Sequence, residues 1–214
     1  MKSLKNWLLV LSVLSCFGCS SSVHEDGRGC AFVSDSIQYR VEFMSEGCVR
    51  ILSFPEGDTL VTKRLVVDSE KPAFKDYKWE DTGQKLLFRT RELSVVFDKA
   101  DAAFIFQETS TGKLLLKEKG DRKARNFKRS VAGGEQCLEV TQCFVPTEDE
   151  AIYGLGQYQN GIMNYRGKSV LLLQANMDIV NPFLISTNGY GVLWDNYSST
   201  KFEDTKEGYS FTSE

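Results

Sequence analysis

The chain has 214 residues, of which 42% are hydrophobic and 12% aromatic, and this is enough apolar side chain for one folded domain. Its formal net charge is −3 at pH 7, which argues against a nucleic-acid partner, because nucleic-acid-binding domains are normally basic. The one histidine is His24, so a histidine-based catalytic triad or a histidine-rich metal site is excluded from the rest of the chain. No metal or other cofactor is predicted, and acid–base chemistry would have to use carboxylates.

Residues 1–18 have the pattern of a targeting signal. Two lysines precede a short apolar stretch, which is followed by small residues and cysteine. This order resembles a bacterial lipoprotein signal, with Cys19 as the predicted lipidated residue, Cys16 as the other candidate, and a plain secretory signal as the alternative. Residues 19–29 would then be a flexible tether. We therefore expect an exported bacterial lipoprotein in the periplasm or at the cell surface, attached to the membrane only through its lipid anchor.

Four further cysteines, Cys30, Cys48, Cys137 and Cys143, follow the signal segment. An exported protein meets an oxidising compartment, and four cysteines allow three disulfide pairings that the sequence does not rank. Within one strand, Cys137 and Cys143 would lie about 20 Å apart, so they could bond only across a turn. Buried free thiols are the favoured interpretation, and the spacing is not that of a zinc site.

Residues 30–214 are predicted to form one all-β domain, a supersandwich-like antiparallel β-sandwich. Apolar and polar residues alternate over 36–44, which is the period of a half-buried strand. Other short apolar runs recur at roughly ten-residue spacing with turn residues between them, as in β-sandwiches. These expected strands are 48–54, 60–67, 74–79, 85–91, 93–97, 103–106, 114–116 and 136–144. The polar and basic stretch 121–134 is expected to be an exposed loop.

Residues 151–197 concentrate glycines, aromatics, amides and acids, in the order A-I-Y-G-L-G-Q-Y-Q-N-G, N-Y-R-G-K-S-V-L-L-L-Q-A-N-M-D and N-P-F-L-I-S-T-N-G-Y-G-V-L-W-D-N-Y. Glycine permits close backbone approach, and aromatic faces beside polar groups suit a polyhydroxylated ligand. The structural alternative is a β-rich core with tight turns, in which Tyr190 and Trp194 are core or edge aromatics. Nucleotide binding is rejected because no G-K-[ST] follows the glycines.

In this order, Y-G-L-G-Q, N-Y-R-G, Q-A-N-M-D, N-P-F-L-I-S-T and G-Y-G-V-L-W-D-N resemble the end of the N-terminal, galactose-mutarotase-like β-sandwich of glycoside hydrolase family 31. That family contains α-glucosidases and α-xylosidases. The run Q-Y-Q-N-G-I-M-N-Y-R-G looks closer to bacterial α-xylosidases. Residues 30–150 are compatible with the same sandwich but carry no sharp motif. The resemblance implies an α-linked oligosaccharide as the ligand.

The resemblance also implies a (β/α)8 barrel that packs on the sandwich. Such a barrel carries two catalytic aspartates, a nucleophile and an acid/base, about 5 Å apart. A barrel needs about 250 residues, and none is found in this sequence, so the chain alone is predicted to be inactive, with no catalytic residue. Without the barrel, an apolar face of the sandwich would be exposed.

In the family, a loop of the sandwich shapes the sugar pocket at the barrel mouth. The matching Q-A-N-M-D makes Asp178 and Asn176 the candidate substrate-binding residues, because carboxylate and amide groups hydrogen-bond sugar hydroxyls. The alternative is that both residues form the turn between two strands. Asp195 and Asn196, which follow a strand, are expected to be turn residues rather than a catalytic acid.

Two hypotheses compete with the glycosidase interpretation. One is a stand-alone, lipid-anchored carbohydrate-binding sandwich without chemistry, and the other is a purely structural surface lipoprotein. A barrel in the same polypeptide would favour the glycosidase. Sugar binding by the isolated chain would favour the binding module over the structural protein.

Overall fold

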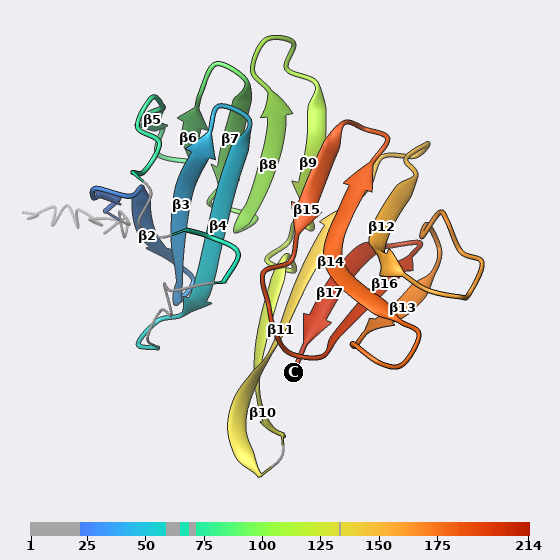
Figure 1. Cartoon of the computed structure of the whole chain (residues 1–214). Helices are drawn as coiled ribbons and strands as arrows, with labels where there is room; N and C mark the ends of the chain where they lie inside the picture. The colour runs from blue at the N-terminus through green and yellow to red at the C-terminus, as the bar shows by residue number, and fades with distance from the viewer. Residues whose placement is uncertain (1–21, 59–64, 69–71, 133) are drawn as a thin grey trace, which may run out of the picture.

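The computed structural model describes residues 22–58, 65–68, 72–132 and 134–214, and every regular element among them is a β-strand (Figure 1). The strands are β1 (His24–Glu25), β2 (Cys30–Ser34), β3 (Ile37–Ser45), β4 (Cys48–Pro55), β5 (Lys78–Asp81), β6 (Lys85–Arg89), β7 (Leu93–Asp98), β8 (Ala103–Glu108), β9 (Leu114–Glu118), β10 (Arg125–Ala132), β11 (Glu135–Val145), β12 (Ile152–Gln157), β13 (Ser169–Leu172), β14 (Ile179–Ser186), β15 (Tyr190–Leu193), β16 (Thr200–Thr205) and β17 (Gly208–Ser213). Within this part of the chain, no helix is long and apolar enough to cross a membrane.

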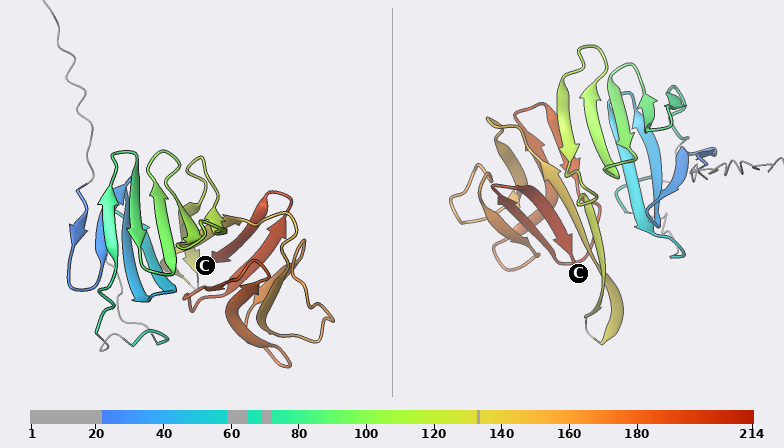
Figure 2. Two further views of the ribbon diagram at one scale, coloured as in Figure 1. Left: turned by 90° about the horizontal axis from the view of Figure 1, so that it is seen from above. Right: turned by 180° about the vertical axis from the view of Figure 1, so that it is seen from behind.

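The strands form three antiparallel sheets. A four-stranded sheet has the order β1-β2-β3-β4, and a three-stranded sheet has the order β12-β14-β15. A ten-stranded sheet has the order β13-β16-β17-β11-β9-β8-β7-β6-β5, with β10 paired to β11. The two smaller sheets pack against different parts of the long sheet, as the two views of Figure 2 show. The predicted all-β, sandwich-like fold is therefore confirmed.

Each small sheet encloses its own hydrophobic core. The first core joins β2–β4 to β6–β8, and Phe32 sits at its centre, with its ring 5.2 Å from Tyr39 and 4.8 Å from Phe97. The second core joins β12 and β14 to β11, β16 and β17, where Phe202 and Phe211 are fully buried. Such aromatic contacts each contribute about 1 kcal/mol beyond the burial of their area.

Two predicted strands differ from the structure. In the expected strand 60–67, residues 60–64 lie outside the described residues and 65–67 form bends. The expected strand 74–79 begins only at Lys78, in β5. Phe74 and Tyr77 precede it in a loop and pack against the first core. Their apolar side chains produced a strand-like pattern without backbone pairing.

The expected exposed loop at 121–134 is wrong for most of its length. Residues Arg125–Ala132 form β10, which pairs with β11 over eight register positions from Arg125↔Gln142 to Ala132↔Glu135. The charged side chains misled the prediction because a hairpin extending away from the sheet can carry charge along both strands. The alternation predicted for 136–144 is confirmed in β11.

The predicted signal peptide and Cys19 lie outside the described residues. The described part of the expected tether is not simply a flexible linker, because β1 pairs with β2 at His24↔Ala31 and Glu25↔Cys30. Asp26 closes this hairpin by accepting hydrogen bonds from the backbone N–H of Arg28 at 2.8 Å and from the Arg40 side chain.

This hairpin predicts a pH dependence. The hydrogen bond from Arg40 is the main reason that the pKa of Asp26 falls from 3.8 to about 2. A lowered carboxyl pKa adds stability above the unfolded-state value, and that stability is lost as the pH falls through the folded-state value. We expect Asp26→Asn to lower the melting temperature slightly at neutral pH and to flatten its decline between pH 3.8 and about 2. A variant whose thermal melts kept the wild-type pH profile would contradict this assignment.

The four cysteines that follow the signal segment are free thiols, as predicted. Cys30 is buried, and burial raises the pKa of its thiol to about 11. The prediction of burial is wrong for Cys48, which is exposed at the start of β4.

Candidate functional site

The predicted substrate-binding residues lie in the turn that connects β13 to β14. The Asp178 N–H donates to the Ala175 carbonyl at 3.3 Å, which closes the turn. The Gln174 side chain bridges the two ends of this turn. Its Nε2 donates to the Asp178 carbonyl at 2.8 Å, and its Oε1 accepts from the Val180 N–H at 3.1 Å. Asn176 is exposed at the tip and Asp178 is half-buried. The turn expected as the alternative is therefore present, and it presents both side chains near the surface.

Glycine in β12 lets the chain pass very close to β14. Gly154 and Gly156 have φ values of +106° and +120°, and the register of β12 on β14 shifts between them. A Cβ at Gly156 would lie 2.0 Å from the Ile179 carbonyl oxygen, and one at Gly154 would lie 2.5 Å from that of Phe183. Close approach of two strands therefore explains the Y-G-L-G motif.

A buried carboxylate, Glu150, links the start of the motif region to the second core. Its Oε1 accepts from Tyr190 and from Ser186 (2.6 Å), and its Oε2 accepts from the backbone N–H of Thr147 at 2.7 Å. The Tyr190 hydroxyl also lies 3.1 Å from that of Tyr209. Burial raises the pKa of Tyr190 and of Tyr209. With both oxygens hydrogen-bonded, Glu150 stabilises the fold and is poorly placed to transfer protons.

Trp194 and Asn196, at the end of the motif region, behave as predicted. The Trp194 ring stacks on Phe211 at 5.5 Å and its Nε1 donates to Ser213 at 2.8 Å, so Trp194 is a core-edge aromatic. The Asn196 Oδ1 accepts the Ser198 N–H at 2.9 Å, which is a turn-forming contact.

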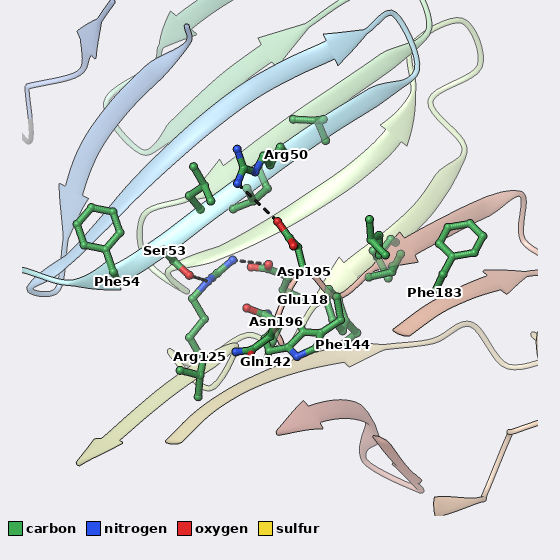
Figure 3. A pocket seen from close by; sticks show the side chains of 18 of the residues that line it. Arg50, Ser53, Phe54, Glu118, Arg125, Gln142, Phe144, Phe183, Asp195 and Asn196 are labelled. Atoms are coloured by element: carbon green, nitrogen blue, oxygen red, sulfur yellow. Dashed lines mark hydrogen bonds and ion pairs between the residues drawn. The ribbon is translucent and has the colours of Figure 1, made fainter. Parts of the chain in front are cut away.

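A groove of about 1370 Å³ lies between β4 and β15, with β9, β10 and β11 contributing to its lining. Figure 3 shows two ion pairs in it. Arg50 on β4 reaches Asp195, just after β15, at 3.6 Å. Glu118 on β9 pairs with Arg125 on β10, and both side chains are only 3% exposed. Four of the charged groups that line the groove are thus paired with each other.

The sequence did not identify the Glu118–Arg125 pair. The Arg125 guanidinium lies 5.1 Å from the centre of the Tyr39 ring and donates to the Ser53 hydroxyl at 3.2 Å. Burial raises the pKa of Glu118, while Arg125 and the N–H of Phe104 oppose that shift. The sequence did carry a signal for the strand that holds Arg125, although not for its pairing with Glu118. Two alternating runs flank Gly133-Gly134, which is a hairpin pattern.

The outer side of the three-stranded sheet and of neighbouring β13 is apolar. Along β14 the exposed positions recur with a period of two, while Leu184 between them is fully buried. Apolar side chains exposed on these strands and the turn between β13 and β14 are Leu171, Leu173, Met177, Ile179, Phe183, Ile185 and Leu193. Clustered exposed apolar residues of this kind mark an interaction surface.

Known proteins resemble this chain over most of its length. An α-xylosidase of Saccharolobus solfataricus is 34% identical over 178 residues, which are 76% of this chain and 23% of that protein. The crystal structure of a family 31 α-xylosidase from Xanthomonas citri matches with a TM-score of 0.75 and 30% identity, over 86% of this chain and 20% of that one. A family 31 α-xylosidase from a soil metagenome, complexed with xylose, has a TM-score of 0.74 and 23% identity, over 90% of this chain and 30% of that one.

The chain therefore spans less than a third of the length of each of these relatives. The sequence profile of the glycosyl hydrolase 31 N-terminal galactose mutarotase-like domain matches residues 38–203. These residues include the three-stranded sheet, the β3 and β4 half of the four-stranded sheet and most of the long sheet. The chain belongs to the family of glycoside hydrolase 31 N-terminal galactose mutarotase-like domains.

Proposed function

We propose that this chain is the non-catalytic N-terminal domain of an exported α-glycosidase, in which it helps to shape the sugar pocket of a (β/α)8 barrel. The observation that carries the proposal is the match to proteins named α-xylosidases, of which the chain covers only 20–30% in the solved structures. Hydrolysis of α-glycosidic bonds would then belong to the longer polypeptide. An α-xyloside is the preferred substrate because two relatives at least 30% identical are α-xylosidases.

The apolar surface on β13, β14 and β15 supports a partner domain. Phe183 and Ile185 are 40% and 49% exposed in the chain by itself. A barrel packed on this side would bury them, which offsets the cost of leaving such side chains in water. The lipid anchor at Cys19 remains part of the proposal and rests on the sequence pattern of residues 1–19 alone.

The direct test begins with the genomic DNA beyond the codon for Glu214. We expect it to encode a barrel, and we expect the longer polypeptide to hydrolyse 4-nitrophenyl α-xyloside while the 214-residue chain does not. Unrelated sequence in that position would contradict the proposal. Calorimetry of the isolated chain with xylo- and gluco-oligosaccharides would then distinguish a binding module from a structural protein.

Asp178 provides a residue-level prediction for the barrel-containing enzyme. A hydrogen bond between a carboxylate and sugar hydroxyls contributes about 1.5–3 kcal/mol, so Asp178→Ala should lower kcat/KM by about ten- to a hundredfold. Asn176→Ala should have a smaller effect. The control is Asp149→Ala, an acidic residue that is exposed just before the motif region and β12. If kcat and KM of the Asp178 variant equalled those of the control, Asp178 would be only a turn residue.

A further inference from the structure

The groove between β4 and β15 separates two sheets that each stop at an edge. β4 is the last strand of the four-stranded sheet, and β15 is the last strand of the three-stranded sheet, within the described part of the chain. The groove lining includes apolar side chains of the long sheet and the ring of Trp194. The apolar lining residues from the long sheet include Leu115, Leu116, Phe127, Leu138, Val140 and Phe144. An unpaired edge next to an apolar surface is a template for another strand.

On β15, backbone hydrogen bonds alternate between the two sides of the strand. The Trp194 N–H donates to the Pro182 carbonyl at 2.8 Å, toward β14. Val192 and Tyr190, two and four residues before Trp194, pair with Leu184 and Ser186, so their backbone groups also point toward β14. Since successive backbone groups of an antiparallel strand point to opposite sides, those of Gly191 and Leu193 point away from β14, toward the groove.

The same reasoning applies to β4. The Glu56 N–H donates to the Ser36 carbonyl at 2.8 Å, toward β3, and the register continues through Gln38↔Phe54 and Arg40↔Leu52. The intervening backbone groups, those of Ile51 and Ser53 among them, therefore point away from β3 and toward the groove. Both walls thus offer a row of N–H and C=O groups.

We propose that the groove accepts one extended strand, which pairs with β4 on one side and β15 on the other and joins the two small sheets into one. Its side chains would alternate, with apolar ones against Leu116 and Phe144 on one side and polar ones beside the Arg50–Asp195 pair on the other. Neighbouring strands lie about 4.8 Å apart, so one strand fits between edges about 10 Å apart. The Arg50–Asp195 contact of 3.6 Å shows that side chains from the two walls meet across the groove.

The occupant is a segment of the same polypeptide joined to Glu214, in a chain as long as the relatives. Figure 1 shows the arrows of β4 and β15 pointing the same way, downward in that view, with the C-terminal end of the chain below both. Ser213 beside that end bonds Trp194, a groove-lining residue, at 2.8 Å. A strand that runs from there into the groove would be antiparallel to both walls, like every other pairing in the fold.

The test is backbone hydrogen exchange on two proteins. One is the 214-residue chain, and the other is the same chain extended beyond Glu214 with the segment that follows the matching region in the Xanthomonas citri α-xylosidase. Covalent attachment raises the effective concentration, so even an imperfect strand should occupy the groove. Exchange at Ile51, Ser53, Gly191 and Leu193 should slow at least about tenfold in the extended chain. Equal rates in the two chains would overturn the proposal.

A proline substitution provides the matched control. Leu193→Pro removes a groove-facing N–H and spares the bonds to β14, so the extended chain should lose the added protection on β15. Leu171→Pro is its counterpart on β13, another edge strand. The Asp204 N–H donates to the Lys168 carbonyl at 2.8 Å. By the same alternation, the backbone N–H of Leu171 points away from the neighbouring strand β16. The Leu171 variant should keep the added protection.

Two outcomes would contradict the choice of occupant. Protection that persists in the Leu193→Pro extended chain would show that the strand does not pair with β15. Protection in the unextended chain that rises with protein concentration, together with a dimer in sedimentation, would assign the groove to a second copy. Because no sugar is used, failure here leaves the glycosidase proposal untouched.

Discussion

Replacing Glu118 with alanine is expected to lower the free energy of unfolding by about 3–5 kcal/mol, because it leaves Arg125 buried without a counter-charge. Both side chains are 3% exposed, and the Arg125 guanidinium packs on the rings of Tyr39 and Phe104, at 5.1 and 5.2 Å from their centres. The variant also removes the acceptor of the Phe104 N–H, which lies 2.8 Å from Glu118. Urea unfolding followed by fluorescence measures the loss.

The control for this prediction is the exposed pair Lys201–Glu203, whose side chains are 51% and 44% exposed. Glu203→Ala should cost less than about 1 kcal/mol, because solvent screens the pair. A double change of Glu118 to leucine and Arg125 to methionine should recover much of the loss, since two apolar groups need no counter-charge. A Glu118→Ala loss as small as that of the control would show that the buried pair is solvated.

Replacing Gly156 with alanine is expected to cost more than about 4 kcal/mol or to prevent folding. The new Cβ would lie 2.0 Å from the backbone oxygen of Ile179, so β12 and β14 would have to separate. The backbone would also hold alanine at φ +120°, which L residues rarely adopt. Thermal unfolding measured by circular dichroism would report the change.

Gly189→Ala separates the steric clash of a Cβ from the strain of a positive φ. Gly189 also has positive φ, +95°, but a Cβ there meets nothing within 4 Å. This variant should cost only about 1–2 kcal/mol, the price of the backbone conformation. Equal losses at positions 156 and 189 would mean that φ strain, and not the contact with Ile179, explains the glycine.

Local pattern was sufficient where a strand buries one face. The alternation in 36–44 and 136–144 predicted β3 and β11, because a period of two places every apolar side chain on the core side. The ordered motifs of 151–197 indicated the family, which the profile match confirms. The turn at Asp178 was expected as an alternative, and its role toward a sugar stays a prediction.

The sequence pattern gave wrong predictions where the burial of a side chain depends on segments other than its own strand. Arg125 reads as a solvent-exposed residue in a basic stretch, and only the approach of β9 and β4 gives it Glu118 and Ser53 as buried partners. Phe74 and Tyr77 read as strand residues and instead reach the first core from a loop.

The sequence by itself determined the fold class, the family and the positions of β3, β4, β6 to β9 and β11, because periodicity and short motifs are properties of neighbouring residues. Only the tertiary structure decided which strands end each sheet, that β4 and β15 face each other across a groove, and that a carboxylate and a guanidinium pair beneath it. These features depend on contacts between strands: Glu118 and Arg125 lie only seven positions apart but on separate strands, and Arg50 meets Asp195 across 145 positions. The burial of these charged side chains is set by such contacts, and no local pattern encodes it.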